Sequence, residues 1–214
     1  MDSNYRFAYE KALADLRAED PEKVCRNALA GFRPGVYTLP FLGRPLRVDL
    51  EQGLVLEGDS GKVLPPGTAM LVLHHLAWAR DVEVEGRWIT LKEVPEGGSL
   101  FFPAFKREVQ DALVATYQHD LPAFEAAAAR LGGSPLALGQ VGARFQMFPK
   151  VPLGIVLWQG DEEMPGTANF YFDRTIHHFA PLETLIGFGY YLAHQLVRAP
   201  EVPEPARRVD PFWE

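Results

Sequence analysis

Three consecutive acidic residues interrupt an apolar part of the chain and could carry chemistry. The segment LWQGDEEMPGTANFYF, residues 157–172, places Asp161, Glu162 and Glu163 between two runs that are typical of core strands. A hairpin needs only about two to five connecting residues, so the length of this loop calls for a reason. Adjacent carboxylates repel one another, which disfavours their burial unless a cation or a basic group is present. The loop is therefore either a solvated turn or part of a ligand or metal site.

Histidine pairs supply a second set of candidate groups. They stand at 74–75, inside an expected helix, and at 177–178, after the second apolar run. His74 is expected on the core-facing side of its helix, and His178 close to the start of the last helix. Glu183 would lie in the first turn of that last helix, where the helix dipole favours a carboxylate. His74, His178 and Glu183 form the candidate metal-ligand set. The alternative for each pair is one packed and one solvated imidazole.

The two ends of the second strand limit how these groups can combine. Asp173 ends the run ANFYFD and either joins a site or bonds the turn that follows. Trp158 ends the preceding run, where a large aromatic is expected to be mostly buried. The acidic loop and Asp173 lie at opposite ends of one strand, so they meet only if the loop folds over. If the loop is a site, Asp161 is expected to turn inward, bond nearby amides and share that site with His178. The candidate ligand-binding set is Trp158, Asp161, Glu162, Glu163, Asp173 and His178.

The elements that must position these groups come in runs of helices and runs of strands. Helices are expected at 4–20, 20–31 with Asp20 as its cap, 65–81 with Thr68 as a possible cap, 103–120, 121–133 and 180–198. Strands are expected as a meander over 36–57, as a pair around Gly86, and at 143–149, 151–159 and 168–173. This order predicts an α+β fold, a single domain over residues 1–199 with helices packed on an antiparallel sheet. Two small subdomains are the alternative, and residues 200–214 are expected to form a proline-rich extension.

Composition excludes several classes of protein. The formal net charge of -7 and the lack of a basic stripe argue against nucleic-acid binding. The apolar runs are too short for a membrane span, and the polar first 16 residues do not resemble a signal peptide. Cys25 is the single cysteine, so internal disulfides and an iron–sulfur cluster held by this chain alone are excluded. A cytoplasmic location is therefore expected.

The chain resembles a known family at VLHHLAWA, at FFPAFKREV and above all over residues 144–185. The family consists of the domains of unknown function numbered 3786, which occur in anaerobic bacteria and archaea. Its pattern includes Pro-x-Val-Pro before a strand, then Trp-x-Gly-Asp-Glu-Glu-x-Pro, Phe-Asp and Leu-Pro-x-Glu, the last of which is shifted here to APLETL. Matching positions are His74, Pro103, Phe105, Pro149, Pro152, Trp158, 160–163, Pro165, Phe172, Asp173, Pro181 and Glu183.

The resemblance implies a metabolic setting but no activity. Some relatives join this domain to an iron–sulfur module similar to that of corrinoid iron–sulfur proteins. That implies a link to anaerobic one-carbon or corrinoid metabolism. Because this chain has one cysteine, such a link would need a separate iron–sulfur or corrinoid protein as partner.

Two functions follow as alternatives. In the first, a soluble binding or accessory protein holds a corrinoid, another tetrapyrrole or a different small molecule between aromatic strands, with His74 or His178 as a possible axial ligand. In the second, a metal-dependent, hydrolase-like enzyme uses histidine and carboxylate ligands on a divalent metal, and a glutamate of the acidic loop acts as base. A scaffold without small-molecule chemistry is a third alternative.

Overall fold

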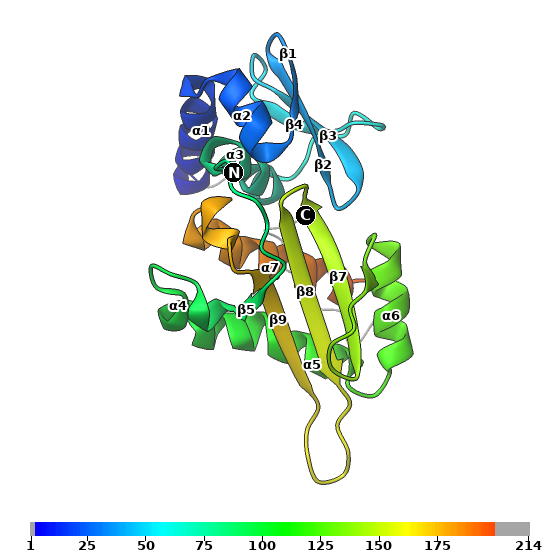
Figure 1. Cartoon of the computed structure of the whole chain (residues 1–214). Coiled ribbons are helices and arrows are strands. Elements are labelled where there is room, and N and C mark those ends of the chain that lie inside the picture. Colours follow the sequence, from blue (N-terminus) through cyan, green and yellow to red (C-terminus); the bar gives the residue numbers. More distant parts are fainter. Residues whose placement is uncertain (1–2, 200–214) are drawn as a thin grey trace.

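The elements form two groups, which lie one above the other in Figure 1. A computed structural model describes residues 3–199. The first group holds a four-stranded antiparallel sheet of order β1-β2-β3-β4 with helices beside it. Its elements are α1 (Ser3–Ala18), α2 (Pro21–Ala28), β1 (Gly31–Arg33), β2 (Val36–Phe41), β3 (Arg44–Asp49), β4 (Leu54–Glu57) and α3 (Pro66–Trp78).

The second group is built on a five-stranded antiparallel sheet of order β5-β9-β8-β7-β6. Its strands are β5 (Trp88–Thr90), β6 (Ser134–Pro135), β7 (Val141–Phe148), β8 (Val151–Trp158) and β9 (Thr167–Asp173). Its helical segments are η1 (Leu91–Glu93), α4 (Gly98–Phe105), η2 (Lys106–Gln110), α5 (Asp111–Tyr117), α6 (Leu121–Arg130), η3 (Ile176–His178) and α7 (Leu182–Val197). The predicted α+β class is confirmed.

The predicted central strand pair is also confirmed. β8 pairs antiparallel with β9, from Leu153 opposite Phe172 to Trp158 opposite Thr167, and β8 is the middle strand of its sheet. Residues 151–157 of β8 are all buried. Side chains on successive residues of a strand point to opposite faces, so this burial requires cover on both faces. Continuous apolar sequence is what such a strand needs.

Several expected boundaries are wrong for local reasons. Helix α2 is capped by Asp20 as predicted, since the Asp20 side chain accepts from Glu22 N at 3.1 Å. It ends before Leu29, which takes a left-handed conformation with φ 53°, and not at Gly31. Helix α3 begins after Pro65, so Thr68 lies inside its first turns and does not cap it.

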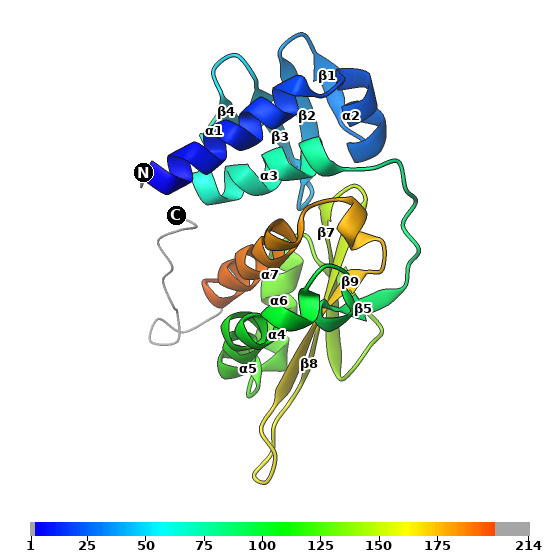
Figure 2. The ribbon, with the colours of Figure 1, turned by 90° about the vertical axis from the view of Figure 1, so that its left-hand side faces the viewer.

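The stretch around Gly86 was expected to be a strand pair, and this is wrong. Only β5 forms there, and residues 79–87 run without regular structure between the two groups (Figure 2). This segment is held at points: Arg80 N donates to His178 O at 3.0 Å, and Arg174 N donates to Arg87 O at 2.8 Å. Its backbone N–H and C=O groups therefore form single hydrogen bonds to other segments and not the regular hydrogen-bond ladder of a sheet.

The helix expected from Pro103 begins earlier, at Gly98, and contains Pro103 inside it. Proline lacks the N–H that would continue the helical bonding, and the next turn, Lys106–Gln110, is a π-helix. Beyond it the helix continues as α5. A Cβ on Gly189 of α7 would overlap the Phe105 ring, so the glycine permits the close helix packing that was predicted for GFGYYL.

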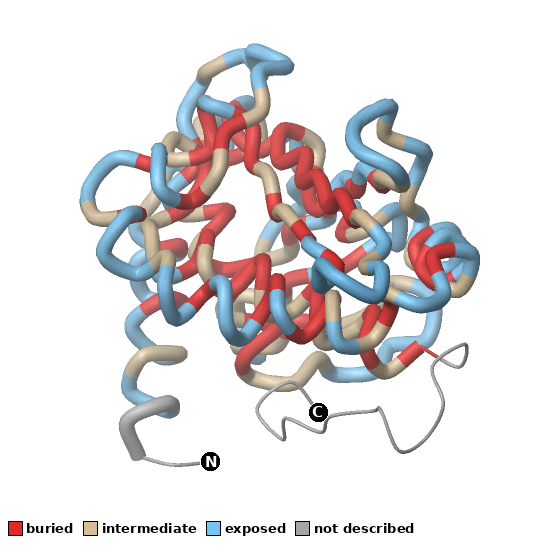
Figure 3. Tube along the Cα trace, turned by 90° about the horizontal axis from the view of Figure 1, so that it is seen from below, coloured by how far each residue is buried: buried red, intermediate tan, exposed pale blue. Residues whose placement is uncertain are grey.

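One continuous core joins the two groups. Buried residues of both belong to a single cluster, and Figure 3 shows them filling the interior while exposed residues lie outside. At the junction Leu42 N donates to Met147 O at 3.1 Å, and the Phe41 ring lies 5.3 Å from that of Phe148. None of the helices within residues 3–199 is both long and apolar enough to cross a membrane. Residues 200–214, where the extension was predicted, lie outside the described residues.

Candidate ligand-binding cleft

The acidic hairpin loop, residues 159–166, uses its most ordered carboxylate to bond its own backbone. Asp161 Oδ1 accepts from Glu163 N at 2.9 Å and from Met164 N at 2.7 Å, and Asp161 N donates to Met164 O at 2.9 Å. The two bonds from the Met164 and Glu163 amides lower the pKa of Asp161. The predicted bonding to nearby amides is therefore confirmed.

The loop does not turn toward the body of the protein. Asp161, Glu162 and Glu163 are all exposed, and none of them forms an ion pair with another residue of the range 3–199. Figures 1 and 2 show the connection between β8 and β9 extending away from all other elements. Met164, beside the acids, is 67% exposed. The inward turn expected of Asp161 does not occur.

Trp158 stands at the base of this hairpin and is mostly buried, with part of its surface exposed. It is the last residue of β8 and the first in that strand that is not fully buried. One face of its indole lies against the loop before β7, where a Cβ on Gly139 would come 2.9 Å from Cζ2. The partner of Trp158 across the sheet is Thr167, which is exposed. The expectation of a mostly buried tryptophan is confirmed, although Trp158 is the residue at which the buried stretch of β8 ends.

Asp173 is buried and fully engaged in structure. Its Oδ1 accepts from Thr175 N at 3.0 Å, from Thr175 Oγ1 at 2.6 Å and from Glu85 N at 3.2 Å. These bonds fix the turn after β9 and the connecting segment 79–87. Of the two alternatives for Asp173, bonding the turn is the one that the structure shows.

The backbone carbonyls of the second histidine pair accept hydrogen bonds from the end of α3 and from the segment that follows it. His177 O accepts from Trp78 Nε1 at 3.2 Å, and His178 O accepts from Arg80 N. The two imidazole rings lie 4.0 Å apart. Burial, the neighbouring His177 and Arg80 together lower the pKa of His178. The seven-residue strand β9 separates His178 from the acidic loop, so the structure does not bring His178 and Asp161 together.

His75, and not His74, is the core histidine of the first pair. His75 is fully buried, and its ring stacks on Phe148 at 4.0 Å. Its Nδ1 lies 3.0 Å from Phe179 O, and since a carbonyl only accepts, Nδ1 carries the proton. Nε2 is buried without a partner among residues 3–199. Burial lowers the pKa of His75 to about 4, so this imidazole is neutral.

His74 lies at the edge of a cleft between α1, α3 and the start of α7, which we call the His74 cleft. The cleft has a volume of about 520 Å³. Burial is the main cause that lowers the pKa of His74, which Asp15 and Glu183 partly oppose. The cleft is lined by Lys11, Ala12, Asp15, Ala18, Glu19, His74, Ala77, Trp78, Arg80 and Pro181.

One hydrogen bond sets the chemistry that His74 offers to this cleft. His74 Nδ1 lies 2.7 Å from Oγ1 of Thr184, which is buried in α7. The hydroxyl proton of a buried threonine needs an acceptor, and Nδ1 is the one that the structure supplies within residues 3–199. Thr184 therefore donates to Nδ1, which leaves the proton of the neutral imidazole on Nε2. The ring then presents an N–H donor and no lone pair to the cleft.

The charged side chains around His74 differ in whether they form ion pairs. Lys11 pairs with Asp15 at 2.6 Å, and Glu19 pairs with Lys23 at 2.6 Å. Arg80 has no ion pair within residues 3–199, and its guanidinium carbon lies 5.6 Å from the centre of the Trp78 ring. Trp78 is 40% exposed. The cleft thus combines an uncommitted cation, an imidazole donor and an exposed aromatic face.

The expected metal-ligand set is not assembled. Within residues 3–199 no three histidine, cysteine, aspartate or glutamate side chains are grouped so that they could hold a metal ion. His74 and Glu183 both lie near the start of α7, but the hydrogen bond of His74 is with Thr184 and not with Glu183. The sequence interpretation missed Thr184, Trp78, Arg80 and Lys11, because His74 and Thr184 are 110 positions apart and no local pattern links them.

A comparison with known families matches residues 20–195 to the family described as domain of unknown function, DUF3786. The match covers most of the chain, including α2 through most of α7. Searches of curated proteins and of solved structures found no match.

Proposed function

The chain belongs to the DUF3786 family, and we propose that it binds a small molecule with an anionic or other acceptor group in the His74 cleft. The bond between Thr184 and His74 is the observation that carries this proposal. It holds the imidazole in one tautomer, so that the free ring nitrogen of this cleft-lining residue is an N–H donor. A donor held in this way favours a carboxylate, phosphate or carbonyl oxygen over a donor group.

The charge around the cleft supports an anionic ligand. Arg80 contributes a guanidinium that no carboxylate within residues 3–199 neutralises, and such a group suits a carboxylate or phosphate. Helix α7 begins at the cleft after Pro181, with no side chain capping it. The free N–H groups of a helix start add positive partial charge. Glu183 and Asp15 oppose this charge, so one anionic group is the expectation and not a polyanion.

The shape of the cleft supports a ligand of ordinary metabolite size. Its volume of about 520 Å³ falls within the roughly 300–1,000 Å³ that is usual for small-molecule sites. The exposed face of Trp78 and the methyl groups of Ala12 and Ala77 give the ligand an apolar surface to lie on. The ligand class is therefore an apolar or aromatic body that carries an acidic group.

A corrinoid or another tetrapyrrole is less well supported at this position. Axial ligation needs the lone pair of an imidazole nitrogen, and Nε2 of His74 carries a proton when Thr184 donates to Nδ1. Tetrapyrrole binding, a separate iron–sulfur or corrinoid partner and a cytoplasmic location stay predictions of the sequence and its resemblance.

Anion binding can be measured by NMR titration with inorganic phosphate and with acetate. We expect saturable shifts of the His74 ring signals and of amides lining the cleft. His74→Ala and Arg80→Met are each expected to weaken binding about tenfold, because each removes one hydrogen bond to a charged group. Arg87→Met, in the same connecting segment, and His119→Ala, an exposed histidine, are the matched controls and should change affinity less than twofold.

Either of two results would reject the proposal. One is the absence of saturable shifts at the His74 cleft with both anions. The other is an equal loss of affinity in the control variants, which would show that the anions respond only to net charge.

A further inference from the structure

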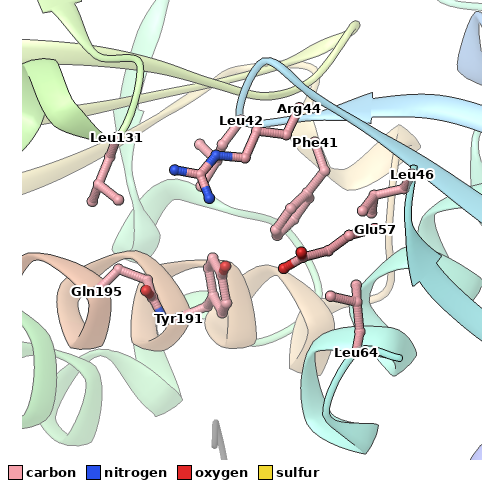
Figure 4. Close-up of a pocket in the computed structure, with 9 residues that line it drawn as sticks. All are labelled: Phe41, Leu42, Arg44, Leu46, Glu57, Leu64, Leu131, Tyr191 and Gln195. Atoms are coloured by element: carbon pink, nitrogen blue, oxygen red, sulfur yellow. The ribbon is translucent and has the colours of Figure 1, made fainter. Parts of the chain in front are cut away.

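A second hollow lies against α7, further along the helix than the His74 cleft. It opens between the β2–β3 hairpin, the β4 strand and the middle of α7 (Figure 4). Tyr191 and Gln195 line it from α7, whereas Thr184 of the first cleft lies about two turns earlier in that helix. The hollow is lined by Phe41, Leu42, Arg44, Leu46, Glu57, Leu64, Leu131, Tyr191 and Gln195.

Strand register places opposite charges on the same side of this hollow. Phe41 pairs with Arg44 across the β2–β3 hairpin, and Leu46 pairs with Glu57 across β3 and β4. Arg44 and Leu46 are two residues apart and therefore share one face of the sheet. That face looks onto α7, and Figure 4 shows the Arg44 guanidinium above Tyr191 and the Glu57 carboxylate to its right.

These two charges do not neutralise each other. No ion pair joins Arg44 and Glu57 within residues 3–199. Glu57 Oε2 accepts from Ser60 Oγ at 2.7 Å, which anchors one oxygen of a carboxylate that lines the hollow. A cation and an anion held apart over the same space suit a molecule that carries both charges.

The walls between the charges are apolar and aromatic. The Phe41 ring lies 5.2 Å from the ring of Tyr191, and Leu46 and Leu64 close one side. Burial raises the pKa of Tyr191 to about 12, while Arg44 acts to lower it and Glu57 to raise it. Both charges therefore reach the Tyr191 hydroxyl, which stays protonated at neutral pH. The hollow thus combines two separate, opposite charges with apolar and aromatic walls.

From this arrangement we propose that the hollow binds a free α-amino acid with a small side chain. The α-carboxylate meets the Arg44 guanidinium, the α-ammonium meets the Glu57 carboxylate, and the side chain lies against Phe41 and Leu64. The cavity volume of about 80 Å³ sets the size limit. A water-sized group needs roughly 10–15 Å³ of such space, so the hollow takes a molecule the size of glycine, alanine or serine and excludes tryptophan.

The binding of L-alanine, followed by calorimetry, tests this proposal. L-alanine is expected to bind saturably, whereas propionate lacks the ammonium, ethylamine lacks the carboxylate, and each should bind at least tenfold more weakly. L-tryptophan should not bind. These comparators separate recognition of a zwitterion from binding of either charge alone.

Matched variants assign that binding to the hollow. Arg44→Met and Glu57→Gln are each expected to weaken L-alanine binding tenfold or more. Arg47→Met, an exposed arginine on the same strand, and Glu51→Gln, an exposed glutamate in the next turn, should change it less than twofold. Ser60→Ala removes the loop bond but keeps the Glu57 carboxylate, so it shows whether a loss in Glu57→Gln comes only from the loop.

Any one of three results would overturn the proposal. These are an absence of saturable L-alanine binding, equal binding of propionate, and equal losses of affinity in the control variants. This hollow is independent of the His74 cleft: His74→Ala should keep its affinity for L-alanine, and Arg44→Met should keep its affinity for phosphate. Either proposal can therefore fail without the other.

Discussion

The acidic hairpin loop and the His74 cleft lie in different parts of the molecule and use their polar groups in opposite ways. In the loop, residues 159–166, the Asp161 carboxylate bonds two amides of its own turn and the other acids face solvent. In the cleft, His74 is held from behind by Thr184 and keeps its second nitrogen for the open side. The charges of the loop are consecutive in the sequence and exposed, whereas those around the cleft come from α1, from Glu19 just after it and from the segment after α3.

The difference indicates which physical features favour ligand binding. A charge surrounded by water interacts weakly with a ligand, because the solvent already solvates both partners. A half-buried donor with one fixed hydrogen bond has lost part of that solvation and keeps its orientation. Clustered charge in sequence is therefore a poorer guide than a polar side chain that is held at one atom and free at another.

The largest expected effect lies in the histidine region and concerns His75. In the unfolded chain this histidine takes up a proton as the pH falls through its ordinary pKa of 6.5, whereas in the folded protein it stays neutral until about pH 4. The unfolded state thus binds more protons in this window, and the free energy of unfolding decreases as the pH falls from about 6.5 to 4. The loss is about 3 kcal/mol, because a difference of one between the folded and unfolded pKa corresponds to about 1.36 kcal/mol. Urea unfolding at several pH values measures it.

A variant assigns this acid sensitivity to His75. His75→Asn keeps an N–H donor for Phe179 O but cannot titrate, so its free energy of unfolding should fall less steeply below pH 6.5. His119→Gln, at an exposed histidine, should keep the full slope. An unchanged slope in His75→Asn would assign the sensitivity to other groups, among which His74 and His178 also have lowered pKa values.

A smaller effect is expected at the base of the hairpin. Trp158→Ala should lower the free energy of unfolding by about 2 kcal/mol, because the residue is mostly but not fully buried and a fully buried tryptophan would cost about 3–5. Phosphate affinity at the His74 cleft should not change. Thermal and urea unfolding measure the first quantity, and NMR titration measures the second. A cost above about 3 kcal/mol would mean that the hairpin base belongs to the core in solution.

The bond between Thr184 and His74 should have an effect of about 1 kcal/mol. Thr184→Val keeps the shape of the side chain but removes the hydroxyl, so His74 Nδ1 loses its partner and the imidazole is free to change tautomer. Phosphate affinity is expected to fall about fivefold, and the ring ¹⁵N shifts of His74 should show a mixture of tautomers. Thr116→Val, at a partly buried helical threonine remote from the cleft, is the control. Unchanged ring shifts in Thr184→Val would contradict the assigned tautomer.

Much of the fold could be predicted because it follows local patterns. The apolar runs that form β8 and β9 and the helix cap at Asp20 are patterns among neighbouring residues. The strand pair and the cap were both confirmed. The connecting segment 79–87 could not be read in the same way. Its alternating valines and glutamates resemble a strand, but its backbone partners are Asp173 and His178, which lie far along the sequence.

The candidate sites were harder to predict for the same reason. His74 was identified, but its role depends on Thr184. The placement of Arg44 and Glu57 around one hollow depends on strand register and on α7. Conversely, no other element covers the acidic loop, so it can keep three consecutive charged residues. That run of charge is conspicuous in the sequence. A motif search finds residues that are close in sequence, whereas these clefts are built from residues that are distant.

The smallest effect is expected from the acidic hairpin loop. The variant with alanine at positions 161, 162 and 163 should bind phosphate at the His74 cleft within twofold of the parent, because β9 separates the two regions. Any change in unfolding midpoint should come from Asp161, whose carboxylate bonds the Glu163 and Met164 amides, and should be reproduced by Asp161→Ala alone. The double variant of Glu162 and Glu163 should resemble the parent. Since these bonds lower the pKa of Asp161, their contribution is present above its ordinary pKa of 3.8 and is lost as the pH falls through the folded value. NMR shifts of the Met164 amide across that range, with thermal unfolding, measure both. A tenfold loss of anion affinity in the triple variant would show instead that the loop reaches the cleft in solution and that the two regions form one site.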